Sequence, residues 1–176
     1  QKMSVLDAHT LCLKEVIIEG ERGKVIDSKC LNGYYVDGIK GTSLSGELID
    51  VGNTDYDVYV INTWFPECLP CIEEIPYLLN LREESNNLEQ SVAFMGLCKC
   101  NVEEETEFIE KHKFNYSHLL EGDKILDSYL PQLGYPVTYI VDSLGKIVDT
   151  FRKITSENYG DLELLILVKH LIIVSP

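Results

Sequence analysis

Two cysteines separated by two residues, Cys68 and Cys71, constrain this sequence more than any other feature, because of the segments on either side. An apolar, β-rich run over residues 56–64 precedes them, and a segment with helical periodicity over residues 72–81 follows. This order puts both thiols in the first turn of a helix, where unpaired N–H groups and the helix dipole favour a thiolate. The pattern therefore predicts a dithiol redox site, although CxxC alone also looks like half of a zinc site.

The composition is that of a globular protein, with 176 residues of which 45% are hydrophobic and 25% charged. This length suits one domain with a sizeable core. The formal net charge of −14 repels phosphate backbones, which argues against nucleic acid as a partner. Residues 162–174 form the longest apolar stretch, which is too short to span a bilayer, so we interpret it as a core helix. Because the chain opens at Gln1, we expect that a leader was removed and that membrane contact is limited to an N-terminal anchor.

Strand and helix signals alternate from residue 56 onward. Two buried-strand candidates, residues 58–61 and 92–97, flank the helix that follows the cysteines, which predicts a βαβ unit. Further downstream we expect helices over 103–113 and 124–130, a hairpin of strands 137–141 and 147–151, and a last helix from about residue 161. Short strand signals in the first part of the chain lie at 16–18, 25–26, 34–36 and 48–51. We therefore expect an α/β domain over residues 42–176, with an N-terminal β-rich extension over residues 1–41 packed on it as one unit.

The remaining four cysteines fall in two groups. Cys12 and Cys30 are either a disulfide, which would contribute about 3 kcal/mol, or two unrelated buried thiols. Cys98 and Cys100 stand at the end of the second predicted strand, where residues two apart point to opposite faces. We therefore expect one buried and one exposed thiol there, with a second redox centre as the alternative. An even number of cysteines is compatible with an oxidising compartment.

Several segments carry a family likeness. They are Val60-Ile61-Asn62-Thr63-Trp64, the CxxC motif itself, Glu74-Ile75-Pro76, and residues 134–142 (GYPVTYIVD) with 145–148 (GKIV). In these residues the chain resembles the thioredoxin-fold proteins, specifically the TlpA/ResA-like extracytoplasmic thiol-disulfide oxidoreductases, over roughly residues 42–172. The resemblance implies a three-layer thioredoxin-like fold, a mixed central sheet with helices on both faces. It also implies a bacterial protein located in the periplasm or anchored to the membrane facing it.

The resemblance assigns a role to each matching residue. Cys68 would be the exposed nucleophile, and Cys71 the buried thiol that resolves the mixed disulfide. Pro136 would follow a cis peptide bond beside the dithiol, and Tyr135 would offer backbone groups to an incoming peptide. A proline that simply starts an edge strand is the alternative. Trp64 would bind the substrate together with Tyr135 and Pro136.

A carboxylate after the motif and another before it are the remaining site candidates. Glu74 shares a helix face with Cys71, and in this family a carboxylate there is linked to proton transfer at the buried thiol. The alternative is a solvated surface glutamate. Glu67 stands where the family usually has an aromatic residue, and its charge should raise the pKa of the Cys68 thiol and make the dithiol a better reductant. Ile72 replaces a commonly basic residue.

The resemblance favours an enzyme: a thiol-disulfide oxidoreductase, acting as a reductant without cofactor or metal. Its partners would be protein thiols or disulfides and an upstream redox partner protein. The alternative is a metal-binding protein of the copper-chaperone branch of the same fold. That branch typically spaces its cysteines by three residues and adds a downstream histidine, whereas here His112 and His118 precede the proline and look like surface residues. A non-catalytic interaction module is a third candidate, against which the intact Cys68, Cys71 and Pro136 argue.

Overall fold

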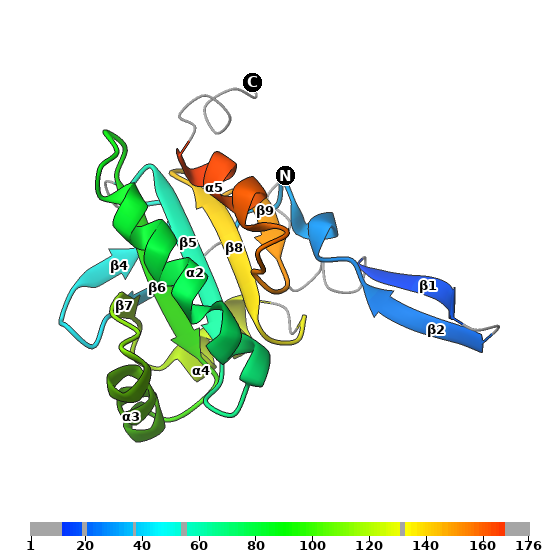
Figure 1. The fold of residues 1–176 in the computed structure, drawn as a ribbon, viewed down its shortest axis with the longest axis horizontal. Coiled ribbons are helices and arrows are strands. Elements are labelled where there is room, and N and C mark those ends of the chain that lie inside the picture. Colours follow the sequence, from blue (N-terminus) through cyan, green and yellow to red (C-terminus); the bar gives the residue numbers. More distant parts are fainter. Residues whose placement is uncertain (1–11, 19–20, 37, 54–55, 131–132, 168–176) are drawn as a thin grey trace.

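The centre of the molecule is a five-stranded mixed sheet with the strand order β7-β6-β5-β8-β9 (Figure 1). The computed structural model describes residues 12–18, 21–36, 38–53, 56–130 and 133–167. Strands β5, β6 and β7 run parallel, whereas β8 is antiparallel to β5 and β9 is antiparallel to β8. The strands are β5 (Val58–Trp64), β6 (Val92–Cys98), β7 (Ser117–His118), β8 (Val137–Asp142) and β9 (Ile147–Phe151).

The predicted βαβ unit is confirmed. All seven residues of β5 are buried, as expected for a strand covered on both faces. Helix α2 (Leu69–Ser85) forms the crossover to the parallel strand β6 and ends at the C-cap residue Asn86. The predicted β8–β9 hairpin is also present, with Gly145 at a positive φ of 81° in its turn.

Helices cover both faces of the sheet, so the molecule has three layers. On one face lie α2, α3 (Val102–His112) and α5 (Tyr159–Leu167), with α2 and α5 side by side in Figure 1. Their apolar side chains, including Leu78, Phe108 and Leu162, pack into one cluster with Val60 of β5. On the other face, α4 (Gly122–Tyr129) packs its apolar side chains into a second cluster. The fold class expected from the sequence is therefore confirmed.

The N-terminal part adds two hairpins and a short 3-10 helix. Strands β1 (Leu13–Ile18) and β2 (Glu21–Ile26) form a hairpin that extends away from the sheet in Figure 1, and η1 (Ser28–Leu31) follows. Strands β3 (Lys40–Thr42) and β4 (Leu48–Asp50) form the other hairpin. The cysteines at 12 and 30 form a disulfide, which decides between the two expectations for them.

The strand predicted over residues 34–36 does not form. Instead, this segment is bonded to the β8–β9 turn and the start of β9: Val36 N donates to Gly145 O at 2.7 Å, and Ile147 N donates to Tyr34 O at 2.7 Å. The β-forming residues of this segment thus pair with an existing hairpin through one isolated β-bridge, and they do not form a strand.

At the C-terminal end, α5 contains the start of the predicted core helix, and residues 168–174 of that prediction lie outside the described residues. Within the described part of the chain, no helix combines the length and apolar character needed to cross a bilayer.

Candidate active site at the start of helix α2

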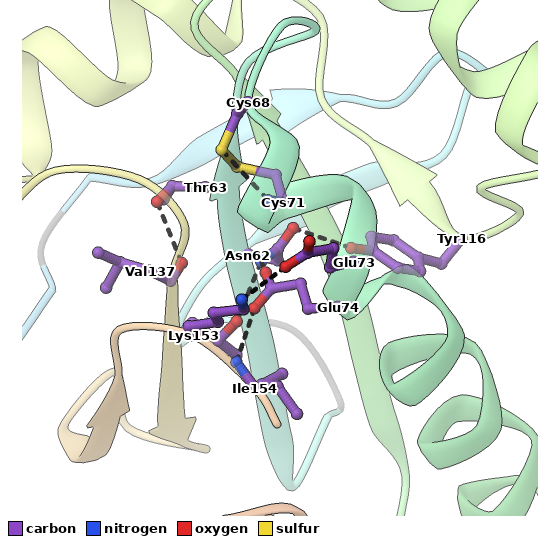
Figure 2. Close-up of a disulfide and its surroundings, with 11 residues drawn as sticks. Asn62, Thr63, Cys68, Cys71, Glu73, Glu74, Tyr116, Val137, Lys153 and Ile154 are labelled. Carbon is purple, nitrogen blue, oxygen red and sulfur yellow. Dashed lines mark hydrogen bonds and ion pairs between the residues drawn. A yellow bond between two sulfur atoms is a disulfide. The ribbon is translucent and has the colours of Figure 1, made fainter. Parts of the chain in front are cut away.

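Cys68 and Cys71 form a disulfide at the N-terminus of α2, as Figure 2 shows. Cys68 is the N-cap residue, and its Sγ accepts a hydrogen bond from Cys71 N at 3.2 Å. Pro70 falls in the first turn of the helix, where the missing N–H costs nothing. Each cysteine is 3% exposed, so the expectation that Cys68 is exposed is wrong for this oxidised state, whereas Leu69 between them is 63% exposed. The local sequence therefore directs the backbone N–H of Cys71 at the sulfur of Cys68.

The loop before β8 reaches the same end of the sheet. The Tyr135–Pro136 peptide bond is cis, as predicted. Val137, the next residue, pairs in register with Thr63, whose hydroxyl donates to Val137 O at 3.0 Å (Figure 2). The Tyr135 ring also meets the Phe65 ring edge to face, with centroids 5.4 Å apart. The loop is thereby held beside the turn that leads from β5 into the dithiol.

Glu74, one helical turn after Cys71, is buried with 1% of its surface exposed. Its Oε1 accepts from Asn62 Nδ2 at 2.7 Å, and its Oε2 accepts from Ile154 N at 2.8 Å (Figure 2). Burial raises the pKa of Glu74 to about 7, against the opposing effect of these two donors. The alternative of a solvated surface glutamate is therefore wrong, and the site contains a carboxyl that exchanges its proton near neutral pH.

Asn62 holds this carboxyl in place, and sequence reasoning did not assign it a role. Its Nδ2 also lies 3.0 Å from Thr138 Oγ1, and its Oδ1 accepts from the Tyr116 hydroxyl at 3.2 Å. Both Asn62 and Thr138 are buried. The signal that could have found this network is the polar pair Asn62-Thr63 in an otherwise apolar, buried strand.

Glu67 is exposed at the edge of a groove of about 290 Å³ between the start of α2 and α3. The lining includes Ile72, Phe108, Lys111 and His112. The structure thus places a carboxylate directly before Cys68 but in contact with solvent, which weakens its electrostatic effect on the thiol.

Solved structures with a similar fold were found, although no family model and no curated protein matches the sequence. One is the thioredoxin domain of a thiol-disulfide oxidoreductase from Bacteroides vulgatus, with 24% identity, a TM-score of 0.64, and coverage of 77% of this chain and 97% of that one. Another is a thiol:disulfide interchange protein from Bacteroides sp., with 22% identity, a TM-score of 0.66, and coverage of 79% and 92%. A secreted disulfide oxidoreductase from Mycobacterium tuberculosis has 21% identity, a TM-score of 0.54, and coverage of 73% and 93%.

The chain has a thioredoxin fold. At these identities the likeness establishes the fold, and it agrees with the resemblance that the sequence motifs indicated.

One residue expected at the substrate surface of this thioredoxin fold lies in its core. Trp64 is 0% exposed, and its ring packs against Phe108 and Phe114, with centroids 4.5 and 5.6 Å away. The side chain of the last β5 residue points under α3, and a substrate contact through Trp64 is not supported by this position.

His118 was expected on the surface and is buried in the two-residue strand β7. Its Nε2 lies 3.1 Å from Phe114 O, and its Nδ1 lies 3.8 Å from Glu105 Oε1. Burial lowers the pKa of His118 to about 3 and raises that of Glu105 to about 7, so both groups are neutral over a common pH range. Within the described ranges, no cluster of three or more His, Cys, Asp or Glu side chains is arranged to hold a metal ion.

The expectation of one buried and one exposed thiol at Cys98 and Cys100 is wrong, because these residues form a disulfide. Strand β6 ends at Cys98, and Lys99 and Cys100 follow in a bend. The alternation of strand side chains therefore does not extend to Cys100, and the two sulfurs meet. All six cysteines of this thioredoxin fold are thus disulfide-bonded.

Proposed function

We propose that this protein is a thiol-disulfide oxidoreductase that uses Cys68 and Cys71 to reduce disulfides in other proteins. The observation that carries the proposal is the position of the dithiol: Cys68 caps α2, and the loop with the cis Tyr135–Pro136 bond lies at the same end of the sheet. Solved structures with the same fold support it, since they are named as a thiol-disulfide oxidoreductase, a thiol:disulfide interchange protein and a disulfide oxidoreductase.

In the reduced protein, the Cys68 thiolate attacks one sulfur of a substrate disulfide, and the other substrate sulfur leaves as a thiolate that takes up a proton. Cys71 then loses its proton and attacks the Cys68 sulfur, which releases the second substrate thiol and closes the Cys68–Cys71 disulfide. The Cys71 N–H and the α2 dipole stabilise the Cys68 thiolate. The substrate disulfide gains two electrons, and the dithiol loses them.

Glu74 is suited to take the proton that Cys71 must lose. Its pKa of about 7 allows it to be ionised before the resolving step and protonated after it. The resolving thiol is itself buried, and Glu74 lies one helical turn further along α2, so a carboxyl acceptor stands on the same helix face as this thiol.

The substrate backbone would pair with Tyr135, which is partly exposed beside Phe65, by addition of a short strand next to Pro136. The negative charge of Glu67 raises the free energy of the Cys68 thiolate, and this favours oxidation of the dithiol to the disulfide. A second protein must then re-reduce Cys68–Cys71, so the cycle requires an upstream dithiol partner.

An oxidising, extracytoplasmic compartment fits the cysteine chemistry. The Cys12–Cys30 and Cys98–Cys100 disulfides lie outside the proposed site, and such bonds are rare in reducing compartments. One of the structures with the same fold is described as secreted.

Cysteine-to-serine variants test the assignment. Cys71→Ser should retain covalent adducts with substrate proteins, because the first step proceeds and the resolving step does not, whereas Cys68→Ser should form none. Both should lose reduction of insulin driven by dithiothreitol, compared with a Cys12→Ser/Cys30→Ser control that keeps both active-site thiols. If the two single variants reduce insulin as fast as the parent, the assignment of the dithiol is wrong.

A further inference from the structure

The Cys98–Cys100 disulfide has no part in the cycle described above, and its short loop makes it a poor structural cross-link. It joins residues two apart in sequence, whereas Cys12–Cys30 joins residues 18 apart. A disulfide stabilises a fold mainly by restricting the unfolded chain, and this effect grows with the length of the closed loop. Closing a loop around Lys99 alone therefore restricts the unfolded chain very little, which leaves the bond without an obvious structural purpose.

The bond lies at the same end of the sheet as the dithiol. Cys98 is the last residue of β6 and pairs in register with Trp64, the last residue of β5. Lys99 N donates to Trp64 O at 2.8 Å, and Cys68 N donates to the next carbonyl, Phe65 O, at 3.1 Å. Two hydrogen bonds to consecutive carbonyls thus link the backbone of Lys99 to that of Cys68.

The side chains share one environment as well. Cys98 is buried in the same apolar cluster as Cys68 and Cys71, and Cys100 packs against that cluster. Cys98 is 1% exposed, whereas Cys100 is partly exposed. Cys100 is therefore the sulfur that an incoming thiolate can reach, and Cys98 is the sulfur that would be released.

We propose that Cys98–Cys100 is a second redox-active disulfide, which accepts an electron pair from the Cys68/Cys71 dithiol. The Cys68 thiolate attacks the Cys100 sulfur and the bond to Cys98 breaks, with Cys98 leaving as a thiolate that is then protonated. Cys71 loses its proton and attacks Cys68, which releases Cys100. The Cys68/Cys71 pair is oxidised and the Cys98/Cys100 pair is reduced, so atoms and electrons balance.

This inference rests on the proposed function, because it needs Cys68 to act as a nucleophile. The direction follows from two features already described. Folding stabilises the Cys98–Cys100 bond very little, because the loop that it closes is so short, and Glu67 favours oxidation of the neighbouring dithiol. The electron donor is the Cys68/Cys71 dithiol, either of the same molecule or of a second copy of the protein. The Cys71→Ser experiment described below distinguishes these two sources.

A redox titration tests the first half of the inference. The folded protein is equilibrated in glutathione buffers of increasing reducing strength, alkylated, and analysed by peptide mass spectrometry. Cys98–Cys100 should open with an equilibrium constant at least tenfold more favourable than that of Cys12–Cys30, which serves as the internal structural control. If the two disulfides open together, Cys98–Cys100 is structural and the inference is overturned.

The Cys71→Ser variant tests the transfer itself, without any added oxidant. Its single thiol at Cys68 should exchange with the second disulfide to give a Cys68–Cys100 cross-link and a free Cys98 thiol, both identified by non-reducing peptide mapping. A monomeric cross-linked product identifies transfer within one molecule, and a dimeric product identifies transfer between copies. An intact Cys98–Cys100 bond beside a free Cys68 thiol, or a cross-link to Cys98, would contradict the proposed step.

A Cys98→Ser/Cys100→Ser variant separates the two proposals. It should reduce insulin through Cys68 and Cys71 as the parent does. If it does so while the cross-link in Cys71→Ser never forms, the second redox centre fails and the proposed function stands. If the variant and the parent are both inactive on insulin, and a Cys71→Ser/Cys98→Ser/Cys100→Ser variant, whose Cys68 has no second disulfide to attack, traps no substrate, the proposed function itself fails.

Discussion

Replacing Glu74 by glutamine should remove one component of the dependence of stability on pH. Burial raises the pKa of Glu74 from its ordinary value of 4.5 to about 7 in the folded protein. The folded state therefore binds this proton more tightly than the unfolded state does. The carboxyl contributes most to stability below pH 4.5, and that contribution is lost as the pH rises through 7. Because one pKa unit corresponds to about 1.4 kcal/mol, the loss amounts to about 3 kcal/mol.

The free energy of unfolding of the oxidised protein, measured by guanidinium denaturation between pH 4 and 8, gives the test. Glu105 adds a component of the same sign, since its pKa is also raised to about 7, whereas His118, with a pKa lowered to about 3, destabilises the fold as the pH falls below 6.5. The contributions of Glu105 and His118 cancel in the difference between the free energies of unfolding of the parent and of Glu74→Gln at each pH. This difference in free energy should change by about 3 kcal/mol between pH 4 and pH 8.

Glu83→Gln is the matched control, because it removes an exposed carboxylate from the same helix. If the Glu74→Gln and parent curves stay parallel from pH 4 to 8, the carboxyl is not titrating within the fold near neutral pH. The proposal that Glu74 accepts the proton of Cys71 would then be contradicted.

Three further substitutions test separate parts of the structure. Glu67→Gln should lower the pKa of the Cys68 thiol in the reduced protein, as measured by thiolate absorbance at 240 nm, and an unchanged or higher pKa would contradict electrostatic coupling between the two. Gly96→Ala should cost about 1–3 kcal/mol, because the added Cβ would collide with the His118 imidazole. Gly160→Ala, in open space on α5, should instead stabilise by up to about 1 kcal/mol; equal effects of the two alanines on denaturant unfolding would refute this packing.

The parts of the fold that could be predicted from sequence are those governed by local patterns. The apolar run before Cys68 and the helical periodicity after Cys71 were sufficient to place β5 and α2, because each signal arises within one element. The cis bond at Pro136 was predicted by a motif, not by periodicity.

The contacts that complete the candidate site are not local, and the sequence did not reveal them. Glu74 is held by Asn62, 12 residues earlier, and by the backbone of Ile154, 80 residues later. The burial of His118 was missed because a two-residue strand has no readable period. The Cys98–Cys100 pairing was missed because the prediction applied strand alternation to residues 98–100, although β6 ends at Cys98 and the backbone bends after it.

The burial of Trp64 gives the molecule an internal optical reporter, since this is the single tryptophan in the chain. Its indole belongs to the cluster that contains the Cys68–Cys71 disulfide and Cys98, and disulfides quench tryptophan emission. The imidazole of His118, 5.6 Å from the indole, becomes a strong quencher only when protonated, and its pKa of about 3 keeps it neutral at working pH. Changes in fluorescence intensity near neutral pH will therefore report the redox state of this end of the sheet, with no label attached.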